Sequence, residues 1–199
     1  MKKIVAVMLA ILISLLYLFR FSAINSDYPK HRQISFKMTE RASYAGSDSL
    51  STLREIGDVD IQVKELEILE YDDLRKIAPS YSDPLLETKQ ASAVRAILVH
   101  VAIRNNLDEQ TIVPVYDYRL QSSSWHNGIQ QDLFFEINNR DSLLLELSSK
   151  EQADLVLVYL MYDFQFYSNS DWVSMQTTQY DLVLMVYPDK YFIRLERLQ

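Results

Sequence analysis

The chain has 199 residues, of which 48% are hydrophobic and only 3 are glycine and 5 proline, which excludes collagen-like and low-complexity classes and allows a substantial core. There is no cysteine, so the fold forms without disulfides. Residues 25–199 carry 17 Lys and Arg against 27 Asp and Glu, a net charge of −10, which argues against nucleic acid as a partner.

The N-terminal segment resembles a signal for membrane translocation. Lys2 and Lys3 precede an apolar run of 16 residues from Ile4 to Phe19, and Arg20 follows it. The run is shorter than the about 20 residues that span a bilayer. The segment from Ile4 to Ile24 has 21 residues and would be long enough if the Arg20 side chain extends to the outer interface. We expect residues 1–24 to be an uncleaved signal anchor, or alternatively a cleaved signal peptide that would leave the protein secreted. The lysines should stay inside, with residues 25–199 outside the cell.

The next segments are a predicted stalk and a first strand. Residues 25–58 are polar and predict a linker, with an edge strand at residues 34–38 as an alternative. Residues 59–74 alternate with a one-residue shift near Lys64, which favours a strand with a β-bulge over a helix. Residues 75–92 contain two prolines and predict a loop with one helical turn at residues 85–89.

The remaining segments read as strands joined by turns. Ile97, Val99, Val101 and Ile103 share one face of a strand, and a second strand runs from Pro114 to Gln121. Asn127–Gly128 predicts a hairpin turn, residues 132–138, 142–148 and 153–162 predict strands, and residues 180–197 predict a closing hairpin around Pro188–Asp189. About eight short strands predict an all-β fold over residues 59–199, an antiparallel Ig-like β-sandwich, with a closed barrel as the alternative.

Four stretches also carry a family resemblance. Residues 94–121, "SSSWHNGIQQDLFFEIN", "SSKEQADLVLVYL" and "LVLMVYPDKYFIRL" together resemble small Ig-like surface domains of low-GC Gram-positive bacteria whose function is unknown. The resemblance covers about residues 60–199 and implies an extracellular Ig-like fold without established catalytic residues. Some members are lipoproteins, but this chain has no lipobox cysteine, so its anchor would be the N-terminal helix.

The sequence predicts no catalytic, cofactor-binding or metal-binding residue. Three glycines are too few for a phosphate-binding loop, and the three histidines, His31, His100 and His126, have no metal-ligand spacing. His100 is expected to be a surface or partly buried polar residue, and His126 a loop residue. The acidic pairs at residues 58–60 and 72–73 lack the context of a calcium loop and are expected to be solvated turns.

One feature suggests a binding surface. Residues 159–172, "YLMYDFQFYSNSDW", hold six aromatic residues, which predict either core rings or an exposed ledge for a protein partner or a cell-wall glycan. Trp125, Phe166 and Trp172 have polar neighbours, so they are the candidate partner-binding residues and should lie closer to the surface than Leu157 or Val186.

These observations predict a membrane-anchored, extracellular, non-catalytic module that binds a protein or a cell-envelope component. One alternative is an accessory or immunity protein whose transmembrane helix takes part in binding. Another alternative is an enzyme that acts on envelope polymers.

Overall fold

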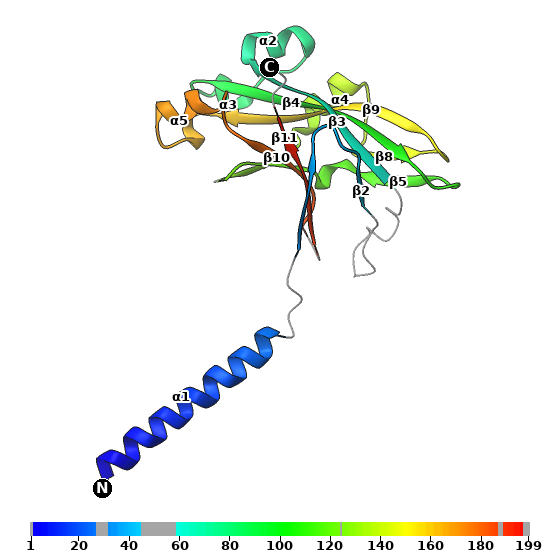
Figure 1. Ribbon diagram of the computed structural model, residues 1–199. Helices are drawn as coiled ribbons and strands as arrows, with labels where there is room; N and C mark the ends of the chain where they lie inside the picture. The colour runs from blue at the N-terminus through cyan, green and yellow to red at the C-terminus, as the bar shows by residue number, and fades with distance from the viewer. Residues whose placement is uncertain (1, 27–31, 45–58, 124, 187–188, 197–199) are drawn as a thin grey trace. The chain divides into compact units, whose positions relative to one another are not determined.

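The computed structural model describes the chain except for residues 1, 27–31, 45–58, 124, 187–188 and 197–199 (Figure 1). The chain divides into two units, Met1–Arg32 and Gln33–Gln199. The first unit is built on helix α1 (Lys2–Ser26), in which the large apolar side chains that the structure describes, at position 8 and between positions 11 and 21, are 54–76% exposed. Among the helices of the described chain, none is both long enough and apolar enough to cross a membrane.

The second unit is a β-sandwich with mixed sheets and several short helices. Its elements are, in order, β1 (Gln33–Lys37), β2 (Ala42–Tyr44), β3 (Val59–Glu70), α2 (Tyr71–Ile77), α3 (Pro84–Glu87), β4 (Val94–Asn105), β5 (Thr111–Pro114), η2 (Val115–Asp117), β6 (Arg119–Gln121), β7 (His126–Gly128), α4 (Gln131–Asn138), β8 (Leu144–Leu147), β9 (Gln152–Tyr162), η3 (Asp163–Gln165), α5 (Asn169–Ser174), β10 (Tyr180–Met185) and β11 (Lys190–Leu195).

The strands form two main sheets and a small third one. One sheet has the order β1-β11-β10-β6-β7, the second has the order β2-β3-β4-β9, and β5 pairs with β8. The pairings are antiparallel except that β1 runs parallel to β11, a departure from the all-antiparallel expectation. Because β1 and β2 belong to the sheets, the folded unit begins at Gln33 rather than at the expected boundary, residue 59. Residues 27–31 and 45–58 of the predicted stalk lie outside the described residues.

The main core lies between the two sheets. Ile97, Val99, Val101 and Ile103 on β4 are at most 1% exposed, as their alternation predicted, and they pack with residues of β6, β10 and β11. The opposite face of β4 is also buried, because Leu74 of α2 and Leu133 of α4 cover Ala96 and Leu98. Helices α2 and α4 both lie on the outer side of this sheet in Figure 1. Because β4 is buried on both faces, the burial of its side chains alternates less than the sequence suggested.

The predicted bulge in β3 is confirmed. Val59, Ile61 and Val63 face the main core, and the pairing with β4 shifts between Val63 and Glu65. The shift turns Leu66 and Ile68 toward the same core and leaves Glu65 and Glu67 on the outer face.

Residues 131–138 form helix α4, so the predicted strand at residues 132–138 is wrong. Leu133, Phe134 and Ile137 all pack inward with helical spacing, and the Gln130 side chain accepts a hydrogen bond from the Asp132 amide at the N-terminus. The helix lies against the outer edge of β9. Asn138 there accepts a hydrogen bond from the Val156 amide (2.8 Å) and donates one to the Val156 carbonyl (2.9 Å).

Three further segments differ from expectation. The predicted strand 114–121 is divided by the 3₁₀ turn η2, which sends β5 and β6 into different sheets. Asn127–Gly128 lies within β7, and the turn before it is closed by the Ser122 amide, which donates to the Trp125 carbonyl. The segment after Glu70 bends into α2 instead of continuing the strand. The closing hairpin β10–β11 is confirmed, although its tip at residues 187–188 is outside the described residues.

Candidate functional site

The aromatic segment after β9 leaves β-structure and becomes two short helices, η3 and α5. The Tyr162 amide donates to the Gln165 side chain (2.9 Å), and the Asp163 amide donates to the Ala93 carbonyl (3.1 Å). Ser168 begins α5 by accepting a hydrogen bond from the Asp171 amide (3.2 Å). Ser168 and Asp171, two of the polar neighbours of Trp172, therefore belong to the cap of a helix.

The three predicted partner-binding residues do not form an exposed ledge. Trp172 is only 7% exposed, with the Phe166 ring at 5.4 Å and the Arg95 guanidinium 4.4 Å above the indole. Phe166 and Trp125 are half-buried against the main core, and the Trp125 ring lies 5.7 Å from that of Tyr180. The expected exposure is thus wrong for Trp172, because α5 turns its side chain inward. Their role in partner binding stays a prediction.

Val186, the expected buried reference, is 66% exposed just after β10, whereas Leu157 is fully buried. Alternation along the strand placed Val186 inside, but the strand ends at Met185 and the pattern ends with it.

Other side chains of the same segment are exposed instead. Phe164 is 57% exposed and stacks on Tyr162 at 5.5 Å, Tyr167 is fully exposed, and Val173 is 58% exposed. We call these three residues, Phe164, Tyr167 and Val173, the β9–α5 surface. The composition of the segment indicated a ring cluster, but only the helical turns decide which members face solvent.

A buried carboxylate lies behind this segment. Asp83 is fully buried and accepts hydrogen bonds from the hydroxyls of Tyr81 and Tyr162 (both 2.9 Å) and from the amides of Leu85 and Leu86 (2.9 and 3.1 Å). Burial, reinforced by the bond to Asp83, raises the pKa of both tyrosines well above the ordinary value. These phenols therefore stay protonated as donors, and the group ties the loop before α3 to the end of β9.

A polar hollow of about 540 Å³ borders Tyr162. Its walls come from the β7–α4 connection and the end of β9, including Asn127, Gln130, Asp132 and Gln165. The amide, carboxylate and phenol groups of this wall can form hydrogen bonds with a bound molecule.

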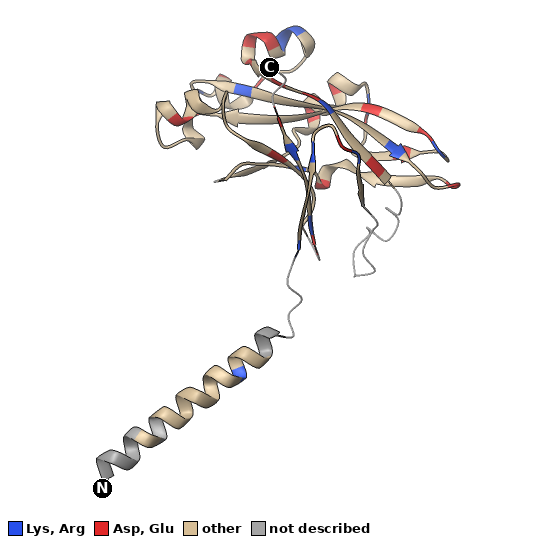
Figure 2. Ribbon diagram, viewed as in Figure 1, with Lys and Arg blue, Asp and Glu red and all other residues tan. Residues whose placement is uncertain are grey.

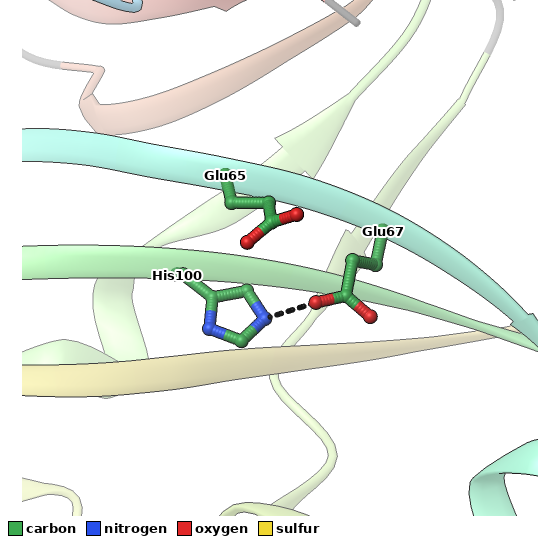
Figure 3. Close-up of side chains that lie close together, drawn as sticks. All are labelled: Glu65, Glu67 and His100. Carbon is green, nitrogen blue, oxygen red and sulfur yellow. Dashed lines mark ion pairs between the residues drawn. The ribbon is translucent and has the colours of Figure 1, made fainter. Parts of the chain in front are cut away.

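A second cluster lies on the outer face of β3 and β4. Glu65 and Glu67 of β3 point toward His100 of β4 (Figure 3). The Nε2 atom of His100 lies 2.9 Å from Oε1 of Glu67, and one potential ligand atom from each residue lies within 4.8 Å of the others. The bulge at Lys64 makes this possible, because it puts Glu65 opposite His100 in the ladder.

Sequence reasoning missed this cluster. It treated His100 as an isolated polar residue, which is correct for local spacing, since Glu67 lies 33 positions earlier in the chain. Combining the predicted bulge with an assumed pairing of the two strands would have brought the three residues together. Only the register, which is a tertiary property, identifies them as neighbours.

Comparison with family models places residues 33–191 in a family described as a domain of unknown function (DUF5028). The chain belongs to this family. The match begins where β1 begins and so includes the two N-terminal strands that the sequence assigned to a stalk. The expected kinship with domains of unknown function is confirmed. A comparison with curated proteins gave no match.

Two solved structures are similar to this DUF5028 chain. One is an uncharacterized beta-sandwich protein from Clostridium difficile, with 9% identity, a TM-score of 0.39, and coverage of 84% of this chain and 97% of that one. The other is a functionally unknown protein from Listeria monocytogenes, with 10% identity, a TM-score of 0.44, and coverage of 82% and 91%. Both come from low-GC Gram-positive bacteria, the group that the sequence resembled.

Proposed function

We propose that this DUF5028 protein is a non-catalytic binding module of the bacterial cell surface. Its N-terminal segment directs export, and its sandwich binds a protein or a cell-envelope component through the β9–α5 surface. The observation that carries the proposal is the exposure of Phe164, Tyr167 and Val173 on one short segment.

The energetics favour a covered state for this surface. Two aromatic rings and a valine in water lose the stabilisation that burial would provide, about 25 cal/mol per Å² of apolar area. Aromatic residues are also the side chains that most often dominate the energy of interfaces. Because a backbone bond from Asp163 to Ala93 fixes η3 and the Ser168 cap fixes α5, binding would require little ordering of the segment.

The strand order supports an Ig-like layout within the sandwich. In one sheet β3, β4 and β9 have the order of Ig strands A, B and E, and in the other β11, β10, β6 and β7 have the order G, F, C and C′. Helix α4 lies at the β9 edge, where strand D would otherwise pair. Modules of this layout present binding residues from loops on a rigid frame.

The proposed export role rests on the charge and hydropathy of the first unit. Figure 2 shows one basic segment in the described part of α1, which the sequence identifies as Arg20. The other described side chains there are mostly large and apolar, and they are exposed on every side. With Lys2 and Lys3 in front of it, such a helix suits insertion in the translocation channel, after which it is either retained as an anchor or cleaved.

Photo-crosslinking in the producing bacterium tests the binding proposal. A benzophenone amino acid in place of Tyr167 should give a light-dependent adduct of higher mass. The adduct should be lost when Phe164→Ser and Val173→Ser are added. Digestion with a cell-wall hydrolase distinguishes an envelope glycan from a protein. The matched control places the same group at Lys89, an exposed position outside the surface. Adducts of equal yield at positions 167 and 89, or none at 167, would contradict the proposal.

A further inference from the structure

We propose that Glu65, Glu67 and His100 bind a divalent transition metal ion of the zinc type on the outer face of the β3–β4 sheet. The site is independent of the β9–α5 surface. One imidazole nitrogen and two carboxylates are a donor set that zinc accepts readily.

The spacing of the three side chains is suited to one ion. Ligand bonds to zinc are about 2 Å long, so ligand atoms around a tetrahedral ion lie about 3.3 Å apart. The distance from His100 Nε2 to Glu67 Oε1 is 2.9 Å, and all three candidate atoms fall within 4.8 Å of one another. Small rotations of the two glutamate side chains, which lie near the surface, would bring the set to ligand distances (Figure 3).

The surroundings of the His100 ring give a second reason. Its Nε2 atom is shielded from solvent, yet within the described part of the chain no aligned hydrogen bond reaches it. The contact with Glu67 is close but has no hydrogen-bond geometry. With Glu67 Oε1 at 2.9 Å the Nε2 atom is not isolated, but its hydrogen-bonding capacity is poorly used, and a coordinate bond to a metal ion would satisfy it.

The local charge also favours a cation. Glu65 and Glu67 project from the same face of β3, and among the described residues neither forms an ion pair with a lysine or arginine. The nearest basic residue in sequence, Lys64, donates instead to Gln62 (3.0 Å). A divalent ion would neutralise two carboxylates that otherwise repel each other.

The donor set points to a transition metal rather than to calcium. Calcium takes six to eight oxygen ligands, whereas this cluster provides one nitrogen and two carboxylates. Three protein ligands leave a fourth tetrahedral position open, which water or a side chain of a partner would fill.

Isothermal titration of the full chain in detergent with zinc chloride tests the proposal. One zinc ion should bind per chain, and His100→Ala, Glu65→Gln and Glu67→Gln should each weaken binding at least about tenfold. The control variants are His126→Ala and Glu109→Gln, which change exposed residues of the same types outside the cluster and should leave the affinity unchanged.

Two results would overturn the site. One is a wild-type chain that takes up no zinc, and the other is undiminished affinity in the cluster variants. If His100→Ala fails to fold, the two glutamate variants decide alone, because their side chains are near the surface and circular dichroism can verify the fold. A parallel titration with calcium chloride should give no comparable binding, and equal affinity for calcium would refute the zinc-type assignment.

Discussion

Replacing Asp83 by alanine should destabilise the sandwich by about 3–5 kcal/mol. The carboxylate accepts four hydrogen bonds in a fully buried position, two from phenols and two from amides at the start of α3. Loss of the helix cap costs about 1 kcal/mol. A buried phenol left without its acceptor costs about 1–3 kcal/mol, and the half-buried Tyr162 regains part of its loss from water.

Urea unfolding at neutral pH, followed by circular dichroism, measures this change. The matched control is Asp72→Ala, which removes an exposed carboxylate in the first turn of α2 and should cost less than about 0.5 kcal/mol. Asp83→Asn should fall between the two, because its amide keeps one acceptor oxygen for the α3 amides. A loss for Asp83→Ala within about 1 kcal/mol of the control would refute the view that this carboxylate organises the loop.

Four further outcomes are expected. Val101→Asp places a carboxylate in the main core and should lower the free energy of unfolding in urea by several kcal/mol, whereas Arg104→Ala on the outer face should lower it by under about 0.5 kcal/mol. Equal losses would contradict the register of β4. Tyr159→Phe removes a buried hydroxyl that has no hydrogen bond within the described residues, so the urea midpoint should stay the same or rise, and a large fall would reveal a missed partner. Burial raises the pKa of Tyr159 above its ordinary value of about 10, so the stability that comes from keeping this phenol protonated is complete below that pH and is lost as the pH rises toward the pKa in the folded protein. The urea midpoint should therefore fall above about pH 10 together with the rise of tyrosinate absorbance, and a flat midpoint would argue against this effect of burial. A reporter enzyme that works only in the cytoplasm, fused after Gln199, should be silent in cells, and activity would end the export proposal.

Local patterns in the sequence predicted the long strands well. The alternation of β4 and β9, the bulge at Lys64 and the closing hairpin all follow from side chains that choose a face within a few residues. These features depend on period and turn chemistry, which are properties of the sequence itself.

The short elements and the site could not be predicted in the same way. Helix α4 has eight residues and is stabilised by docking of Leu133 and Phe134 on the sheets, so its apolar residues read equally well as a strand. Trp172 faces inward because α5 turns it under Arg95, a residue 77 positions earlier. The Glu65–Glu67–His100 cluster likewise depends on strand register, which only the folded chain fixes.

The contact between α4 and β9 has a consequence for self-association. Strand β9 ends its sheet, is 11 residues long and contains the apolar run from Leu155 to Met161. Such an edge can template pairing with another chain and start aggregation. Asn138 occupies both backbone groups of Val156, and the Gln130 amide takes the Val158 carbonyl, much as a neighbouring strand would. The rate of intermolecular strand addition should therefore follow local opening of this eight-residue helix rather than global unfolding of the sandwich.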